Sequence, residues 1–269
     1  MNIQNTMANI SCKILLLGAG SAAGKTKFGR ELTDRSKEKV TLIFISLDRG
    51  YRTPPKYAFE DIKSYNFDKP EAFDWPLMVQ TTRVLVDKVK DAKVGDELEY
   101  KLPVYDFKTH RRAEEFEQFK ITLDKPRVAI VLEGIFALHN KDLLDMADFK
   151  IFIDANDKTR IFRRMIRDLL FRDRNVLEIV LQILKFVDPA HERMVLPTKQ
   201  HATITVNNNI SVEEIENIMN KLRMEGCENF TPTEMKRVFA DKEETFVTGV
   251  GKSFNEGIGF IAQFLSMTE

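Results

Sequence analysis

The stretch ILLLGAGSAAGKTKFG, residues 14–29, decides the fold of this chain. It opens as an apolar run typical of a buried strand and closes with Gly24, Lys25 and Thr26, the end of a phosphate-binding loop. Where a strand leads into such a loop and a helix leaves it, backbone N–H groups converge on phosphate at the helix N-terminus. The stretch therefore predicts a nucleotide site at residues 20–26.

The glycine that should open the loop, five residues before Gly24, is Ala19. If this position needs a positive φ, a Cβ there costs on the order of 1 kcal/mol. Gly18 and Gly20 flank it and can share the bend. We therefore expect Ala19 to be tolerated with a modest loss of nucleotide affinity.

The short pattern Gly-Lys-Ser/Thr recurs at Gly251-Lys252-Ser253, but Phe246 stands where the opening glycine belongs. Too little chain follows this second copy for a sheet to be built beyond it, so we expect only the first copy to bind phosphate. The predicted ATP-binding residues are Gly20, Ser21, Ala22, Ala23, Gly24, Lys25 and Thr26. In this arrangement Lys25 reaches the β- and γ-phosphates and the Thr26 hydroxyl ligates Mg²⁺.

The composition argues against several classes of protein. Lys plus Arg and Asp plus Glu each total 41 of the 269 residues, so the basic excess of a nucleic-acid-binding protein is missing. The first twenty residues contain no run long enough to span a membrane and lack the basic start of a signal peptide. Only two cysteines occur, and no metal-binding Cys/His spacing is visible. We expect a cytoplasmic protein with neither nucleic acid nor membrane as a partner.

Apolar, β-branched runs alternate with helical patterns along the chain. This alternation predicts an α/β doubly wound fold with a mainly parallel sheet. Five strands are expected at 12–18, 40–47, 127–134, 149–154 and 202–206, and helices at 25–37, 75–91, 111–119, 157–172, 176–186 and 211–224. A β-hairpin is expected at 92–107 with its turn near Gly95-Asp96. Residues 1–209 are assigned to the main domain and 210–269 to a C-terminal helical appendage of unknown role.

Carboxylates end three of the predicted strands, at Asp48, Glu133 and Asp154. Ligands of open α/β sheets bind beyond the carboxyl ends of the strands. Two carboxylates beside a phosphate loop suit both Mg²⁺ and a hydroxyl nucleophile that needs a base. Asp154 comes just before a predicted helix start, and we interpret it as a helix cap. The sequence NKDL at 140–143 lacks the final Asp of a guanine-binding motif and is interpreted as a chance match.

The predicted helix at 157–174 is rich in arginine, the residue whose planar fork grips phosphate. Its arginines are Arg160, Arg163, Arg164, Arg167, Arg172 and Arg174. Arg160, Arg164 and Arg167 share one face by helical spacing. A solvated surface helix is one interpretation, and a lid that closes over phosphate is the interpretation we favour.

With these pieces placed, the chain resembles the uridine–cytidine kinase family, within the wider uridine kinase and phosphoribulokinase group, over about residues 12–206. Besides the loop, the resemblance rests on SLDRGY (46–51), NFDKPEAFD (66–74), PVYDFKTHRR (103–112), VLEGIFAL (131–138), TRIFRRMIRD (159–168) and LPTKQHA (196–202). It implies a P-loop kinase with a β-hairpin lid over the substrate and an arginine-rich helical lid. It also implies ATP and Mg²⁺ as cofactors, and a homo-oligomer, specifically a tetramer.

The resemblance implies a role for each matching residue. Asp48 would accept the proton of the ribose 5′-hydroxyl of uridine or cytidine, giving UMP or CMP in pyrimidine salvage. Asp68 with Arg174 would hold the 2′- and 3′-hydroxyls. The base would be recognised by Tyr105 and His110, with Tyr51, Phe67 and Phe107 packing beside it. The predicted metal ligands are Thr26, Glu133 and Asp48, and the predicted catalytic residues are Asp48, Lys25, Arg167 and Arg172. Arg164 and Gln182 would lie near the substrate.

Three departures from the family pattern raise alternatives. Ala19 replaces a glycine, Gly50 stands where a bulky aromatic is usual and leaves space or flexibility beside the base, and Asp173 replaces a glycine of the lid. A kinase acting on another small hydroxyl compound, such as a sugar phosphate or a vitamin precursor, is one alternative. A catalytically weak regulatory relative is the other, although it predicts the loss of Lys25, Asp48 or the lid arginines, which are present.

Overall fold

The structure is a computed structural model that describes residues 10–172, 174–213, 216, 220, 223, 224 and 252–267. Half of the helix expected at 211–224 lies outside these residues, as does Asp173. Among the helices that are described, none combines the length and the apolar character needed to cross a bilayer.

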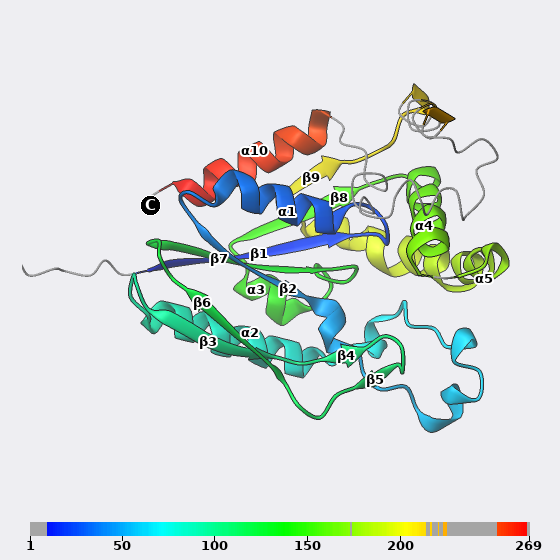
Figure 1. Cartoon of the computed structure of the whole chain (residues 1–269), viewed down its shortest axis with the longest axis horizontal. Coiled ribbons are helices and arrows are strands. Elements are labelled where there is room, and N and C mark those ends of the chain that lie inside the picture. The colour runs from blue at the N-terminus through cyan, green and yellow to red at the C-terminus, as the bar shows by residue number, and fades with distance from the viewer. Residues whose placement is uncertain are drawn as a thin grey trace, which may run out of the picture.

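A five-stranded parallel sheet forms the centre of the molecule (Figure 1). Its strands are β1 (Ser11–Ala19), β2 (Thr41–Ser46), β7 (Arg127–Gly134), β8 (Phe149–Asp154) and β9 (Ile204–Asn207), in the order β2-β7-β1-β8-β9. The central strands are apolar on both faces, as a sheet covered by helices requires. All five predicted strands are confirmed, with ends within two residues of the expected positions.

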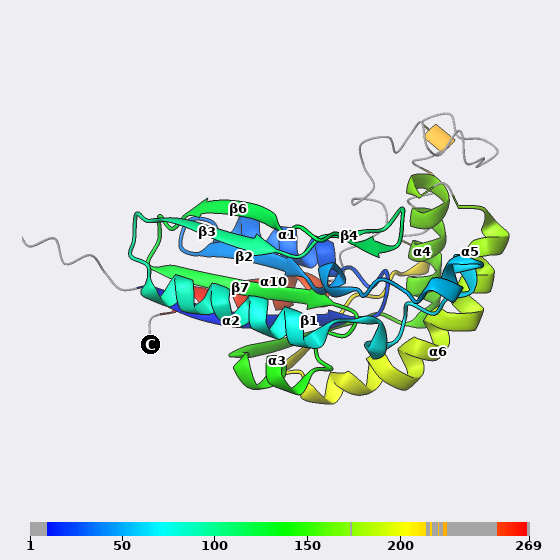
Figure 2. The ribbon, with the colours of Figure 1, turned by 90° about the horizontal axis from the view of Figure 1, so that it is seen from below.

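Helices cover both faces of the sheet (Figures 1 and 2). One face carries α1 (Lys25–Ser36) and α10 (Lys252–Ser266), and the other carries α2 (Trp75–Asp91) and α3 (Lys141–Met146). The predictions of α1 and α2 are confirmed, whereas α3 was not predicted. Asn140, the first residue of NKDL, caps α3 by accepting the N–H of Leu143 at 3.1 Å, which supports the chance-match interpretation.

The helix α10 belongs to the same core as the phosphate loop. Phe254 is fully buried and meets Phe28 of α1 edge-on, with ring centroids 5.4 Å apart. Gly257 brings α10 so close to β9 that an added Cβ would lie 2.6 Å from Val206 Cγ2. The boundary at residue 209 stays a prediction, but this part of the expected appendage packs directly on α1 and β9.

A long hairpin crosses the outer side of α2 and differs from the predicted one. Its stem pairs β3 (Glu97–Leu102) with β6 (Glu117–Thr122), and its tip pairs β4 (Tyr105–Asp106) with β5 (Arg111–Arg112). A turn is present at the expected place, where the Asp96 N–H donates to Lys93 O at 3.1 Å, but it precedes the hairpin, so its assignment as the hairpin turn is wrong. The helix expected at 111–119 is also wrong. Gly95 instead opens the stem, donating its N–H to Leu123 O at 2.8 Å with φ at 101°.

The true hairpin turn is held by Asp106. Its carboxylate accepts the N–H of Lys108 at 2.7 Å and the hydroxyl of Thr109 at 2.8 Å, as an Asx-type turn does. Tip residues 105–112 therefore double back without a glycine.

The remaining helical segments form one end of the molecule (Figure 1). They include α4 (Asp157–Phe171) and α5 (Val176–Gln182), followed by a π-helical turn (Ile183–Val187), α6 (Asp188–Ala190), a second π-helical turn (His191–Val195) and a 3-10 turn (Leu196–His201). Further 3-10 turns lie at Leu47–Gly50, Lys56–Phe59, Ile62–Ser64 and Pro70–Ala72. Asn156 caps α4, accepting the N–H of Thr159 at 2.8 Å. The cap predicted at Asp154 is thus wrong, because Asp154 pairs with Lys199 Nζ at 2.6 Å instead.

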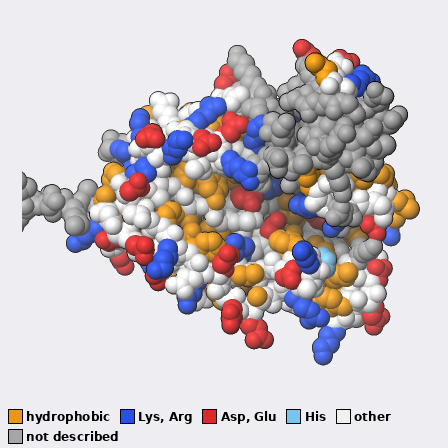
Figure 3. All heavy atoms as spheres, in the orientation of Figure 1, with side chains coloured by type: hydrophobic (Ala, Val, Ile, Leu, Met, Phe, Trp, Pro, Cys, Tyr) orange, Lys and Arg blue, Asp and Glu red, His pale blue; other side chains and the backbone are white. Residues whose placement is uncertain are grey.

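Basic and acidic side chains are interspersed over the described part of the face seen in Figure 3. Exposed pairs such as Lys120–Glu99 and Lys141–Asp145 illustrate this mixture.

Replacing Phe254 by Ala tests whether α10 is integral to the core. The change removes a fully buried aromatic ring beside Phe28, so we expect the free energy of unfolding to fall by about 3–5 kcal/mol in urea titrations. The matched control is Phe260→Ala in the same helix, where the side chain is 53% exposed and the loss should be about 1 kcal/mol or less. Equal small losses would show that α10 is dispensable for the core.

Candidate active site

A cavity of about 360 Å³ opens beyond the carboxyl ends of β1, β2 and β7. Of the predicted site residues, it is lined by Ser21, Ala22, Gly24, Lys25, Thr26, Asp48, Tyr51, Phe67, Asp68, Tyr105, Phe107, His110, Glu133, Arg164, Arg167, Arg172, Arg174 and Gln182. The other two predicted residues of the loop, Gly20 and Ala23, are buried and do not line the cavity. Lys27 and Ile135 also line the cavity and were not predicted.

The loop between β1 and α1 places its backbone strain at Ala22 instead of Ala19. Ala19 ends β1, pairs with Ile153 of β8 and is fully buried. Among the described non-glycine residues, only Ala22 (φ 61°) and His110 (φ 54°) have positive φ. Residue 19 therefore does not need a left-handed backbone, and Ala19 is an ordinary strand residue.

Two glycines of the loop are required by close approach. A Cβ on Gly20 would lie 2.8 Å from both Arg160 Cδ and His191 Nδ1. Gly24 has φ at 104°, and a Cβ there would lie 2.4 Å from Asn208 Nδ2. Asn208 supports the loop from behind, donating from Nδ2 to Ala23 O at 2.8 Å. Sequence reasoning missed Asn208, because only the fold brings the end of β9 under the loop.

The carboxylates of Asp48 and Glu133 lie on the floor of the cavity beside Lys25. Burial, and then the charge of Glu133, raise the pKa of Asp48 to about 6, against the opposing charge of Lys25. Burial lowers the pKa of Lys25, while Glu133 and Asp48 oppose that shift. Lys25 Nζ donates to the carbonyl oxygens of Gly20 (3.3 Å) and Ala19 (3.4 Å).

The donor set on this floor fits Mg²⁺ in the manner of phosphate-transfer sites. Among the described residues, no three His, Cys, Asp or Glu side chains gather into a metal cage. Mg²⁺ at phosphate sites needs only one or two carboxylates, because phosphate oxygens and water complete its octahedron. The Thr26 hydroxyl with Asp48 and Glu133 would supply such a set, and a bound cation would offset the like charges of the two carboxylates.

Four arginines gather round one buried carboxylate, Asp168 of α4, which sequence reasoning missed. Its oxygens lie 2.8 Å from Arg167 Nη2 and 3.5 Å from Arg164 Nε. Arg172 Nε and Arg174 Nη1 approach at 3.6 and 3.9 Å. Burial opposes ionisation of Asp168, yet Arg167 and Arg164 hold its pKa below the ordinary value. The arginines of the predicted lid therefore form a cluster organised by a central anion, and closure of this cluster over phosphate stays a prediction.

The lid is joined to the phosphate loop and to α5. Arg164 Nη1 donates to Ser21 Oγ at 2.7 Å, and its Nη2 donates to Gln182 Oε1 at 3.0 Å. Gln182 Oε1 also accepts from Arg174 Nη1. Burial lowers the pKa of Arg164, and Asp168 opposes that shift.

Two arginines predicted for the lid do not reach the cavity. Arg160 is buried and pairs with Asp157 and, at 3.6 Å, with Asp188. Arg163 is fully buried and donates to Asn208 O at 2.9 Å. The shared face inferred from helical spacing holds, since Arg160 and Arg164 both meet the phosphate loop, at Gly20 and Ser21. Arg160 nevertheless packs against Gly20 and does not line the cavity.

Five aromatic rings wall the far end of the cavity from the phosphate loop. Tyr51 meets Tyr105, Phe67 and Phe107 at centroid distances of 5.3, 6.0 and 6.3 Å. Phe67 stacks on His110 at 5.0 Å, and His110 has the left-handed backbone noted above. Strained backbone of this kind is concentrated at functional sites. The aromatic wall offers a flat apolar slot with imidazole and phenol groups at its edge.

Asp68 lies between the aromatic wall and the lid. Burial raises its pKa, against the opposing charges of Arg164 and Arg174. Asn66 Oδ1 accepts the Asp68 backbone N–H at 2.9 Å and fixes the turn that presents the side chain. A carboxylate flanked by guanidinium groups can hold a pair of hydroxyls.

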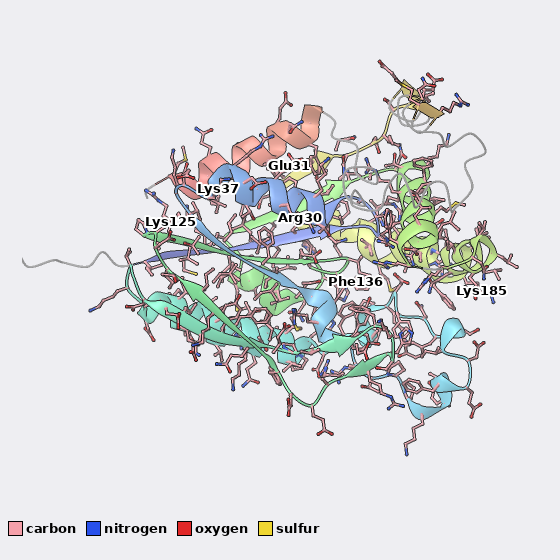
Figure 4. All side chains as sticks on the ribbon, in the orientation of Figure 1. Arg30, Glu31, Lys37, Lys125, Phe136 and Lys185 are labelled. Carbon is pink, nitrogen blue, oxygen red and sulfur yellow. The ribbon has the colours of Figure 1, made fainter. Side chains whose placement is uncertain are left out.

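Apolar side chains pack beneath the aromatic wall and leave no free space at Gly50. Phe136, labelled in Figure 4, lies just past β7 and meets Phe73 edge-on at 5.6 Å. A Cβ on Gly50 would lie 2.5 Å from Met78 Cγ of α2. The interpretation that Gly50 leaves space beside the base is therefore wrong, since Met78 occupies that volume.

The fold and the cavity define the class of protein as a P-loop kinase, with a phosphate loop, a carboxylate floor and an arginine lid around one pocket. D-glycerate 3-kinase from Cryptococcus neoformans var. grubii shares this fold, with a TM-score of 0.51 at 13% identity over 80% of this chain and 90% of that one. Residues 14–216 match the Phosphoribulokinase / Uridine kinase family. The chain belongs to that family.

Two relatives show the extent of the similarity. Uridine-cytidine kinase B of Dictyostelium discoideum is 37% identical over 207 residues, which cover 77% of this chain and 79% of that protein. A uridine kinase of Lactobacillus johnsonii is 34% identical over 196 residues, which cover 72% of this chain and 85% of that protein.

Glycine substitutions in the loop test where its strain lies. Ala22→Gly should raise the free energy of unfolding by about 0.5–1 kcal/mol, because it removes a Cβ from a left-handed backbone. Ala19→Gly should lower it by a similar amount, about 0.5–1 kcal/mol, because it loosens a buried strand. Calorimetric ATP titration should give no gain in affinity for Ala19→Gly. A tighter complex would restore the view that Ala19 impairs the loop.

Replacing Asp168 by Asn tests the organisation of the lid. Four guanidinium groups lose their buried counter-charge, so we expect about 3 kcal/mol less stability at pH 7 in urea unfolding. The folded pKa of Asp168 is depressed, so its contribution is present above about pH 4 and should fade as pH falls through its folded pKa.

The control for this change is Asp145→Asn, the same substitution in an exposed pair with Lys141. It should cost less than about 0.5 kcal/mol. A similar small cost at Asp168 would mean that the arginines are held apart by other contacts.

Proposed function

We propose that this protein transfers the γ-phosphate of ATP to the ribose 5′-hydroxyl of uridine and cytidine, giving UMP and CMP. One observation carries the proposal: a single cavity holds the phosphate loop at one end and the aromatic wall with Asp68 at the other, with Asp48 between them. The names of the relatives from Dictyostelium discoideum and Lactobacillus johnsonii, a uridine-cytidine kinase and a uridine kinase, support the same substrates.

The donor end of the cavity supplies positioning and charge neutralisation, which phosphoryl transfer mainly needs. Lys25 and the N–H groups of the loop would hold the phosphates, and Arg167 and Arg172 would balance the charge of the transferred group. Mg²⁺, held by Thr26 with Asp48 and Glu133, would neutralise phosphate charge when bound.

The acceptor end would bind the nucleoside in one orientation. Asp68 with Arg174 would hold the 2′- and 3′-hydroxyls, and Tyr105 and His110 would meet the edge of the pyrimidine. The 5′-hydroxyl then points to Asp48, which accepts its proton as the oxygen attacks phosphorus. A pKa near 6 leaves Asp48 ionised at neutral pH and able to act as this base.

A nucleoside fits this site better than another small hydroxyl compound does. The five aromatic rings can stack against a flat heterocycle, whereas a sugar phosphate has no flat ring to pack against them. The filled space at Gly50 removes the feature that favoured a different acceptor. We also propose a cytoplasmic location and a homo-oligomer, a tetramer, from the family resemblance.

The proposed function is tested by measuring ADP release from Mg²⁺-ATP with uridine, cytidine, adenosine or no acceptor. Turnover is expected with uridine and cytidine, and Asp48→Asn should lower kcat by at least about 100-fold. ATP binding without turnover of either pyrimidine nucleoside would show that the acceptor is a different molecule.

The same variant should stabilise the fold in the absence of nucleotide and Mg²⁺. The raised pKa of Asp48 means that ionisation destabilises the folded state as pH rises from about 4 to about 6. Asp48→Asn removes that charge, so its free energy of unfolding at pH 7 should exceed the wild-type value by about 2 kcal/mol. The gain should vanish at pH 4, and a gain that is independent of pH would contradict the assignment to this carboxyl.

A further inference from the structure

Arg112 lies in β5, yet its guanidinium leaves the hairpin and reaches the turn that carries Asp48. Its Nη2 donates to the carbonyl oxygens of Gly50 at 2.8 Å and Tyr51 at 2.7 Å. Its Nε donates to Tyr51 O at 3.2 Å, and its backbone N–H donates to Thr53 Oγ1 at 2.9 Å. One residue therefore joins the hairpin tip to residues 50–53 through four hydrogen bonds.

The same guanidinium also fixes the start of α2. Nη1 donates to Asp74 Oδ2 at 2.7 Å, in an ion pair whose side chains are only 21% and 20% exposed. Asp74 caps α2 by accepting the N–H of Leu77 at 3.4 Å, and its own backbone N–H donates to Gly50 O at 2.7 Å. Arg112 thus ties together three elements: the hairpin tip, the Asp48 turn and the N-terminus of α2.

A second arginine anchors the other side of the turn to the hairpin. Arg49 Nη1 donates to Pro103 O at 3.2 Å and pairs with Glu117 Oε2 of β6 at 2.8 Å. Asp48 is therefore carried on a short turn that the hairpin holds on both sides.

We propose that Arg112 is a positioning residue that sets the distance between the nucleoside-recognition hairpin and the Asp48 carboxylate; this inference rests on the proposed function. Tyr105 and His110 of the hairpin tip hold the base, whereas Asp48 meets the 5′-hydroxyl at the opposite end of the same ligand. A displacement of about 1 Å between two such ends can cost on the order of 100-fold in rate.

The chemistry at this position requires arginine. The rigid fork of a guanidinium donates to Gly50, Tyr51 and Asp74 at once, whereas a lysine ammonium is a single point charge that cannot keep this geometry. The matched control is Arg111, the preceding residue, whose guanidinium lies over the Phe59 ring at 4.4 Å. Lysine retains that cation–π contact.

The kinetic test compares Arg112→Lys with Arg111→Lys under saturating Mg²⁺-ATP. Arg112→Lys should lower kcat with uridine by about 10–100-fold and raise the KM for uridine, while the KM for ATP stays unchanged. Arg111→Lys should leave all three values unchanged. An equal rise in the KM for ATP, or an unchanged kcat, would overturn the proposal.

A double-mutant cycle separates the ion pair from the helix cap. Asp74→Asn removes the charge that Arg112 contacts but keeps an equally good N-cap for α2. If the two residues act through one contact, the fold-loss in kcat of the double variant should be clearly smaller than the product of the single losses. Losses that simply multiply would show that the effect of Arg112 does not pass through Asp74 and would overturn the part of the proposal that ties the turn to the start of α2.

Hydrogen exchange gives a readout that is independent of turnover. The backbone amides of Asp74 and Arg52, which donate to Gly50 O and Ala72 O, should exchange faster in Arg112→Lys but not in Arg111→Lys. Amides in the middle of α2 should keep their protection. Faster exchange throughout the molecule, or unchanged exchange at these two amides, would overturn the proposal. If the wild type fails to phosphorylate uridine, the proposed function falls, and this measurement still decides whether Arg112 holds the turn.

Discussion

The pairing of β1 between β7 and β8 is the constraint on which the site depends. In this register Leu17 of β1 and Ser46 of β2 both align with Glu133 of β7. The phosphate loop therefore leaves the sheet beside Glu133, and the turn with Asp48 begins at the same level. Two carboxylates and a loop of N–H donors meet because these parallel strands end at nearly the same level of the sheet.

The charged groups of the cavity are separated by sign. Asp48 and Glu133 are the negative groups beside Lys25, and the arginines around Asp168 are the positive groups. Such an arrangement is costly in a partly buried space unless each set of charges has an internal partner. Asp168 supplies that partner for the arginines, and Lys25 does so for the floor. The arginine cluster is consequently held together by a residue of the chain itself. In the proposed function this would supply the preorganisation that electrostatic stabilisation of a transition state requires.

The sequence predicts what depends on neighbours along the chain and misses what depends on distant partners. The strands at 127–134 and 149–154 and the helix at 75–91 follow from apolar runs and caps, and the structure has the same bounds. The prediction of the hairpin fails because the turn at Gly95-Asp96 precedes β3 and does not join it to its partner, which lies at 117–122. Gly50 was misinterpreted because the space beside it is decided by Met78 of α2. Asp168 is an exception to this rule, since its partners are near in the sequence and Arg164 and Arg172 lie four residues away on either side, at helical spacing. The loop motif, the strand ends and the family resemblance together named eighteen residues that line one cavity, since motif positions reflect distant contacts that local patterns do not, and the roles of these residues stay predictions.

The packing of α10 on α1 has a consequence for how the chain is made. The apolar face of α1, with Phe28 and Leu32, follows directly from the phosphate loop, but its cover at Phe254 and Ile258 is synthesised more than two hundred residues later. At ribosomal speeds of about 5–20 residues per second, that delay is about 10–45 s. Throughout it, two large apolar side chains of the nascent protein wait without their partner. The packing around α1, which follows the phosphate loop near the start of the chain, is thus among the last parts of the core to be completed. During that interval the exposed apolar face of α1 is open to chaperones.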